Sequence, residues 1–139
     1  MATFNKFESF VEALAEKVHN LGSDTLKVAL SNSAPVATNT VLANITQISN
    51  GNGYTTGGTQ ATQVDSLQTS GTYKLRLNDV TFTATPGSVG PFRYVVLYND
   101  TATNDELIGW YDYGTALTIT AGNTFTVDFD GTTGVLTIA

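Results

Sequence analysis

The spacing of apolar residues at the start of the chain predicts one amphipathic helix. The apolar stripe consists of Phe4, Phe7, Val11, Leu14, Val18 and Leu21. Intervals of three and four place these side chains on one face of an α-helix about 17 residues long. Asn5 followed by Glu8 fits a capping box at the helix start, and Gly22 is placed to end the helix. Residues 1–22 are therefore expected to form an N-terminal helix that docks on the rest of the domain or on a neighbouring subunit.

After Gly22 the apolar positions alternate with polar ones, which predicts β-strands. The alternating segments are 26–30, 63–68, 73–77, 80–84, 117–120, 124–129 and 135–138. Glycine, asparagine and aspartate residues between them favour tight turns, and no second helix is available as a crossover between parallel strands. The sequence therefore predicts a mainly β chain, an antiparallel β-sandwich or jelly roll of about eight or nine strands with one N-terminal helix. Residues 23–139 form its body.

The segment 91–114, PFRYVVLYNDTATNDELIGWYDYG, predicts two further strands that are apolar on both faces. Strict alternation places Phe92, Tyr94, Val96 and Tyr98 on one face of the first strand, and in the second strand it groups Leu107 with Tyr111. Strands of this kind are usually covered on both sides. One helix can cover only part of a second face, so a partner chain is expected to cover the rest, which predicts a homo-oligomer.

Between residues 32 and 62 the alternation lapses, and only 41–48 could form a short helix. A loop of this length inside a small domain is usually functional or is an ordered excursion across the surface. Two interpretations stay open. The segment is either an Ω-like loop packed on its own domain or an arm that contacts another chain.

Composition and charge exclude several classes of function. With 6 basic and 12 acidic residues the net charge is −6, and the scattered lysines and arginines form no face for nucleic acid. The chain has no cysteine, which excludes thiolate chemistry and cysteine-bound metals. His19 is the only histidine, is expected at an exposed or boundary position, and accompanies no nucleophile motif. Since no catalytic or metal motif is present, we expect no enzyme and no cofactor. The chain has no apolar run long enough for a membrane span and no signal-peptide pattern at its start, so we expect synthesis in a cytosol.

Two ligand classes can be weighed from the residues. Asp128 and Asp130, within the run DFDG, fit the beginning of a calcium loop but not its remainder. Two solvated carboxylates beside a turn are the more common arrangement, and a calcium ion there stays an open alternative. The tyrosines and Trp110 of segment 91–114 could in principle stack on a sugar, yet the apolar character of both strand faces indicates core or interface positions.

The order of several segments along the chain resembles that of a group of small virion proteins of tailed bacteriophages. The segments are FNKFESFVEALAEKVHNL, DTLKVALSNSAP, NGNGYTTGG, VGPFRYVVLYNDTA, LIGWYDYG and TFTVDFDGTTGVLTIA. The capsid cement, or decoration, proteins are the most similar in size and pattern, and the resemblance spans essentially the whole chain. It implies a β-sandwich or jelly-roll module, commonly a homotrimer, that binds the head exterior at junctions between capsomers of the major capsid protein.

The resulting expectation is a non-enzymatic cement protein on the virion head, made in the host cytoplasm, with no nucleic-acid or membrane partner. A phage tail or fibre module and a receptor- or carbohydrate-binding β-sandwich are the alternatives. Contacts are expected from the N-terminal helix, the 32–62 loop and the acidic tip at 99–106. The candidate interface residues are Phe4, Phe7, Val11, Tyr54, Asp100, Asp105, Glu106, Trp110 and Tyr113.

Overall fold

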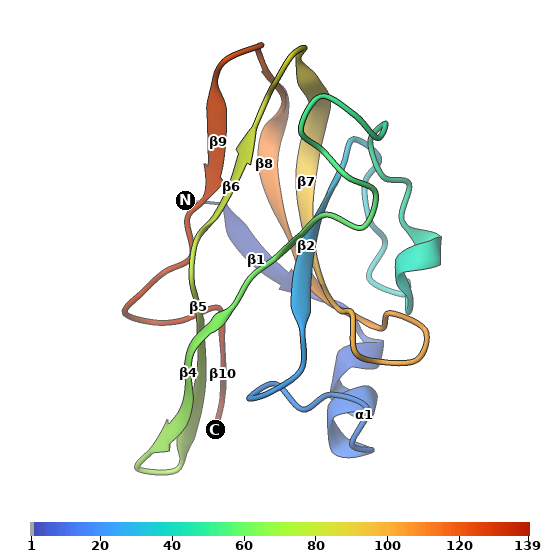
Figure 1. Ribbon diagram of the computed structural model, residues 1–139. Coiled ribbons are helices and arrows are strands. Elements are labelled where there is room, and N and C mark those ends of the chain that lie inside the picture. Colours follow the sequence, from blue (N-terminus) through green and yellow to red (C-terminus); the bar gives the residue numbers. More distant parts are fainter. Residues whose placement is uncertain (1) are drawn as a thin grey trace.

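The first of two β-layers is a five-stranded antiparallel sheet with the two longest strands, β7 and β8, near its centre (Figure 1). From edge to edge it consists of β1 (Thr3–Lys6), β8 (Leu107–Ile119), β7 (Val89–Asn99), β2 (Leu26–Ser31) and β3 (Thr59–Gln60). This computed structural model describes residues 2–139. The strand pairs β7–β8 and β2–β7 join segments rich in valine, leucine and tyrosine, which favour extended backbone.

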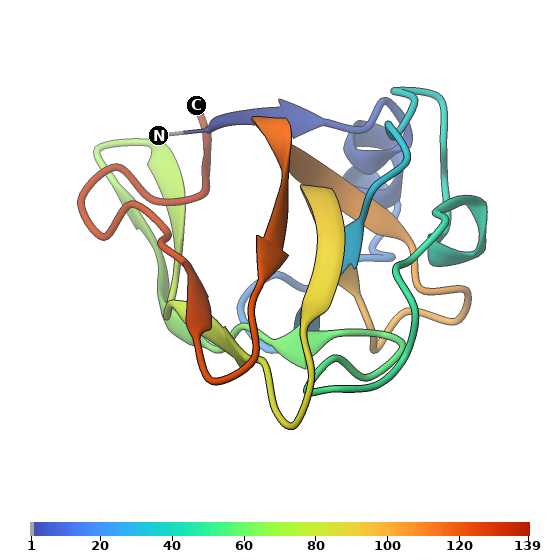
Figure 2. The same ribbon diagram turned by 90° about the horizontal axis from the view of Figure 1, so that it is seen from above.

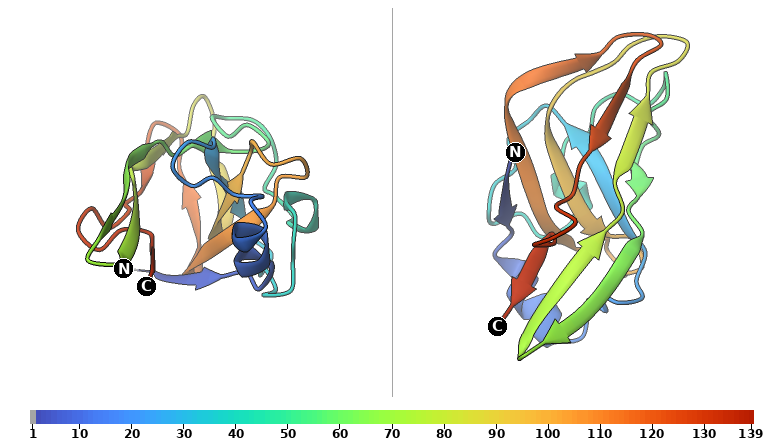
Figure 3. Two further views of the ribbon diagram at one scale, coloured as in Figure 1. Left: turned by 90° about the horizontal axis from the view of Figure 1, so that it is seen from below. Right: turned by 90° about the vertical axis from the view of Figure 1, so that its left-hand side faces the viewer.

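The second layer consists of two short antiparallel sheets arranged end to end. One contains β10 (Leu136–Ile138), β5 (Thr72–Leu77) and β4 (Gln63–Thr69), and the other contains β6 (Val80–Thr83) and β9 (Thr124–Val127). Only Asn78 and Asp79 separate β5 from β6, so β6 continues the course of β5 (Figure 3, right). This layer lies across from the five-stranded sheet, and the predicted antiparallel sandwich with one helix near the N-terminus is confirmed.

The helix is shorter than the apolar spacing predicts. Helix α1 spans Ser9–Ala15, and the residues before it form β1, which pairs with β8. The capping box expected from Asn5 and Glu8 is absent, because Asn5 lies in β1 and Glu8 is itself the N-cap residue, without a side-chain cap bond. Lys17 has a φ of 69°, which is not helical, so the chain leaves the helix before Gly22. The predicted start of the helix was wrong because Phe4 packs equally well from a strand. In β1 its ring lies 5.4 Å from the ring of Tyr111.

The main core lies between the two layers. Fully buried side chains from both layers meet there, including Val28, Leu75, Phe82, Phe92, Val95, Leu97 and Ile108. Each large apolar side chain removed from water in this way contributes about 1.5–3 kcal/mol before the loss of conformational entropy is counted. Phe10 of α1 and Leu21 of the segment after it join the same core, so the N-terminal region is part of this domain.

A second, smaller core covers the outer face of the five-stranded sheet. It contains Phe7, Ala29, Ile45, Val96, Tyr98 and Leu107, with Leu42 and Trp110 packed against it. The ring of Phe7 lies 4.6 Å from that of Trp110. The double-sided burial predicted for β7 and β8 is confirmed, but the chain itself supplies the cover through Phe7 and the 32–62 loop. This face therefore does not require a partner chain, and the homo-oligomer stays a prediction.

Two bulges change which residues share a face of β7 and β8. The register shifts between Phe92 and Tyr94, so Phe92 points into the main core and not, as strict alternation predicts, to the side of Val96 and Tyr98. A second shift beside Leu97 groups Ile108, and not Leu107, with Tyr111. A bulge adds one residue to one strand and so reverses the facing of all residues beyond it.

The long loop is packed on its own domain. Its short helix η1 (Leu42–Asn44) lies within the predicted 41–48 segment. The amide of Leu42 donates to the carbonyl oxygen of Asp105 at 3.0 Å. The hydroxyl of Tyr54 donates to Gln47 Oε1 at 2.6 Å and accepts from the amide of Leu30 at 3.2 Å. Burial raises the pKa of Tyr54 to about 12. The hydrogen bonds of Leu42 and Tyr54 to the rest of the domain support the interpretation of this segment as an Ω-like loop.

Candidate interaction surface

One side of the sandwich leaves an edge strand of each layer without a neighbour. β1 is an edge of the five-stranded sheet, and β10 is an edge of the three-stranded sheet. β1 and the C-terminal strand β10 lie on this same side, and α1 follows β1 (Figures 2 and 3). Unpaired strand edges are common points of association between protein chains. We refer to the surface formed by β1, α1, β10 and residues 16–24 as the seam.

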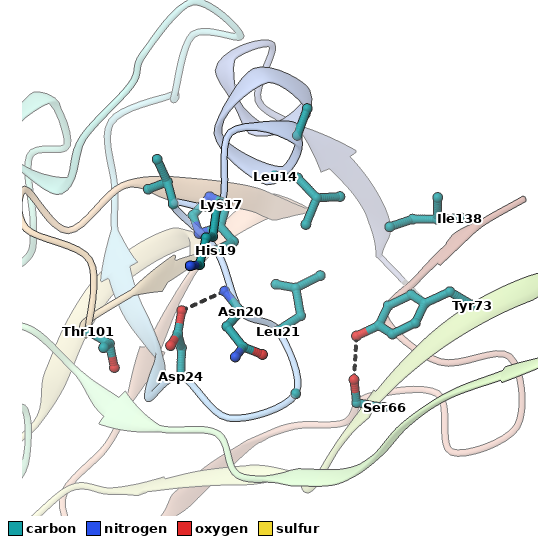
Figure 4. A pocket seen from close by; sticks show the side chains of 13 residues that line it. Leu14, Lys17, His19, Asn20, Leu21, Asp24, Ser66, Tyr73, Thr101 and Ile138 are labelled. Atoms are coloured by element: carbon teal, nitrogen blue, oxygen red, sulfur yellow. Dashed lines mark hydrogen bonds between the residues drawn. The ribbon is translucent and has the colours of Figure 1, made fainter.

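Two adjoining hollows form the seam. The first is an apolar groove of about 470 Å³ between α1 and β10, lined by Phe4, Phe10, Val11, Leu14, Leu136 and Ile138. The second, of about 770 Å³, shares Leu14 and Ile138 with the first and extends to Asp24 (Figure 4). On the side of Ile138 the hydroxyls of Ser66 and Tyr73 are 2.6 Å apart. The seam thus joins an apolar groove to a second hollow that is lined by both apolar and polar side chains.

Three exposed apolar side chains are grouped on the seam. Val11 is 53 % exposed, Val18 37 % and Ile138 39 %. Within residues 2–139, the other large apolar residues with comparable exposure are Val36 in the long loop and Val64 and Leu67 on β4. Grouped apolar exposure beside unpaired strand edges is typical of an interaction site and rare elsewhere on a soluble surface.

The seam carries little net charge, because Lys6 and Lys17 offset most of the charge of Glu12, Glu16 and Asp24. Lys6, Lys17 and Asp24 are the charged residues that line its two hollows, whereas the chain as a whole carries −6. Two acidic chains repel each other least where their negative charge is locally balanced. The seam therefore combines apolar area with a charge that permits another copy to approach.

The acidic tip between β7 and β8 is held in one conformation. Lys27 Nζ lies 3.1 Å from Asp100 Oδ2. Burial, together with the negative charge of Asp100, raises the pKa of Asp105 above its usual range. Glu106 accepts hydrogen bonds from the backbone and side chain of Asn104. The tip thus presents a negative surface with fixed geometry.

The remaining predicted interface residues differ in how much surface they offer. Phe7 and Tyr54 are 0 % and 1 % exposed, so both support the interior and neither can contact a partner without a rearrangement. Trp110 is half-buried against Phe7, and Tyr113 is half-buried with its ring 5.4 Å from that of Phe125. Among the predicted residues, Phe4 and Val11 lie on the seam.

The candidate calcium ligands do not converge. Asp130 Oδ1 accepts hydrogen bonds from the amides of Thr132 at 2.7 Å and Thr133 at 2.8 Å, which hold the pKa of Asp130 below its usual range. Asp128 is exposed. Within residues 2–139, no three aspartate, glutamate or histidine side chains are grouped in a way that could hold a metal ion. Asp130 therefore serves the turn that precedes β10.

The only histidine of the chain is buried, although the sequence predicts an exposed or boundary position. His19 is 5 % exposed and not at an exposed or boundary position. The segment after α1 turns inward and carries His19 between Phe10 and Asn99. A helix extending to Gly22 would have left this ring at the surface, so the early end of α1 explains its burial.

Neither a membrane-spanning helix nor a match to a known protein is found for the part of the chain that the structure describes. The one α-helix within residues 2–139, α1, is too short and too polar to cross a bilayer. No protein-family model, curated protein or solved structure shows a significant match to this chain.

Proposed function

We propose that the chain is a non-enzymatic structural protein of a tailed-phage virion, which binds the outside of the head between capsid subunits and stabilises the shell. The observation that carries the proposal is the seam, a grouped apolar surface beside two unpaired strand edges. Such a surface suits a module whose activity is association. The order of the segments along the sequence, which resembles that of capsid cement proteins, supplies the class of assembly.

The two surfaces have separate roles in this proposal. The seam contacts a neighbouring copy and builds a homotrimer, because its balanced charge allows like chains to meet there. The acidic tip, with Asp100 and Glu106, contacts the major capsid protein through fixed negative charge. The trimer then places several tips on adjoining capsid subunits.

Stabilisation of the shell follows from mass action. A protein that binds the assembled shell and not its separated subunits lowers the free energy of the assembled state. Three tips on one trimer bind as a unit, so individually weak contacts give strong attachment. The acidic balance of the chain fits a position outside the shell, away from packaged DNA.

A tail or fibre module is the alternative that uses the same surfaces. Carbohydrate recognition has less support, because Tyr54, Tyr98 and Tyr111 are 1 %, 1 % and 9 % exposed and offer no stacking face. Trp110 is itself packed against Phe7. A receptor-binding role would therefore have to use surfaces other than the aromatic residues of the central strands.

The number of copies in each virion separates head from tail. We expect quantitative mass spectrometry of purified virions to find hundreds of copies of this chain per particle, because a head lattice repeats its binding site over the whole shell. The major capsid protein in the same sample is the internal reference. A count of a few copies per particle would contradict the cement proposal and favour the tail or fibre module.

A further inference from the structure

His19 joins the segment after α1 to the end of β7. The ring is 5 % exposed and stacks on that of Phe10, with centroids 5.4 Å apart and an angle of 30° between the planes. Its Nδ1 lies 3.0 Å from Nδ2 of Asn99, a residue with no exposed surface. Asn99 is the last residue of β7 and the first residue of the acidic tip. Asn99 thus links the base of the tip to residues 16–24 through two side chains, His19 and Asp24.

The surroundings of Asn99 determine which nitrogen of His19 carries the proton. Oδ1 of Asn99 accepts hydrogen bonds from the amides of Thr101 at 3.0 Å and Ala102 at 3.2 Å. Its Nδ2 therefore faces His19 and also donates to Asp24 Oδ2 at 2.7 Å. Nδ1 of His19 must accept, so the proton of the neutral ring resides on Nε2. Among residues 2–139 that Nε2 has no hydrogen-bond partner.

Protonation is incompatible with this arrangement. An imidazolium carries hydrogen on both nitrogens, so Nδ1–H would point at the NH₂ group of Asn99. Asn99 cannot reverse its amide without losing the bonds from Thr101 and Ala102 and its own bond to Asp24. The contact must open before the ring can take up a proton.

The charged groups that face the ring come from two segments. Asp24 lies in the same connection as His19, and Glu106 is the last residue of the tip, next to β8. Both carboxylates favour the imidazolium, but burial is the larger influence and lowers the pKa of His19 below its ordinary value of 6.5. Asp24 is already engaged, since Asp24 Oδ2 also accepts from the amide of Asn20 at 2.8 Å.

We propose that the His19–Asn99 contact is an acid-sensitive joint, which fastens residues 16–24 to the base of the tip near neutral pH and releases them as the pH falls. The inference is independent of the proposed function. The opened state binds the proton more readily than the closed one, so the joint has its full stability above pH 6.5 and loses it as the pH falls toward the lower pKa of the closed form. Release would mobilise Val18 and Leu21, which line the seam.

Amide hydrogen exchange with residue resolution tests the joint. We compare the intact wild-type chain with His19→Asn between about pH 7.5 and pH 5, a range that brackets an ordinary histidine. The asparagine Oδ1 can take the place of Nδ1 as acceptor, but it does not titrate. After correction for intrinsic exchange, the opening equilibrium constant of wild-type residues 17–25 should rise about tenfold for each unit that the pH falls below the ordinary histidine pKa. Residues 17–25 of His19→Asn should change much less, and amides of the β6–β9 pair serve as a control within each sample.

A second measurement needs no variant. Because His19 is the only histidine, its ring protons give one NMR titration. We expect its pKa below 6.5, with the amide signals of Thr101 and Ala102 shifting over the same pH range. A histidine pKa at or above 6.5, or equal pH dependence in wild type and His19→Asn, would overturn the proposal.

Discussion

Replacing Phe7 by alanine should lower the free energy of unfolding by about 3–5 kcal/mol, as expected for a large apolar side chain removed from a packed core. Phe7 is 0 % exposed and belongs to the second, smaller core, which covers the outer face of β7 and β8. Its loss leaves a cavity against Val96 and Trp110. Urea denaturation followed by tryptophan fluorescence measures the change, because Trp110 is the only tryptophan and packs against this core.

Val36→Ala is the control for this experiment. Val36 belongs to the loop that supplies other parts of the same cover, but it is 57 % exposed, so its truncation should cost less than about 0.5 kcal/mol. A comparable small effect for Phe7→Ala would contradict the conclusion that the chain covers this face by itself. The face would then require another subunit, as the sequence alone predicts.

Gly58→Ala should cost about 4 kcal/mol or more, or prevent folding, because the new methyl group has no space. Gly58 has φ +76°, and a Cβ there would lie 1.7 Å from the carbonyl oxygen of Val28. Val28 pairs with Thr59 in the β2–β3 ladder, so relief of the clash requires β3 to leave the sheet. Thermal denaturation gives the cost, and exchange of the Ala61 amide, bonded to the carbonyl of Leu26, reports whether the segment detaches.

Gly71→Ala separates the clash from backbone strain. Gly71 has a similar φ of +83° in the turn between β4 and β5, but nothing lies within 4 Å of the place that an alanine methyl group would take. Strain alone should therefore cost about 1–2 kcal/mol. Equal destabilisation by the two substitutions would mean that Gly58 is required only for its φ, and that β3 is not held against β2 as closely as the structure has it.

Much of the fold follows from the sequence because alternation is a local property. The strands that begin at Leu26, Gln63 and Val80 agree with the alternating segments within one or two residues. The first residues were assigned wrongly because Phe4 and Phe7 satisfy a helical stripe and also a strand followed by a turn. The facing of Phe92 could not be predicted either, since a bulge depends on the partner strand.

Less of the seam could be predicted from the sequence. The helical stripe correctly drew attention to Phe4 and Val11, which lie on the seam. Ile138 was missed because only the pairing of β10 with β5 brings it beside α1, more than a hundred residues away in the chain. Tyr54 looked like a surface residue in a polar loop, yet hydrogen bonds with Gln47 and Leu30 hold it inside. Long-range contacts of this kind leave no periodic signal.

Co-sedimentation with mature phage heads emptied of DNA tests the central claim most directly. We expect the wild-type chain to sediment with heads and to saturate at a fixed number of copies per shell. Val11→Glu, on the seam, should weaken this binding at least tenfold, because loss of the trimer removes multivalent attachment. Val64→Glu is the matched control, at 50 % exposure against 53 % for Val11, and should bind as the wild type does. Attachment to host cells or glycans with none to heads would contradict the account.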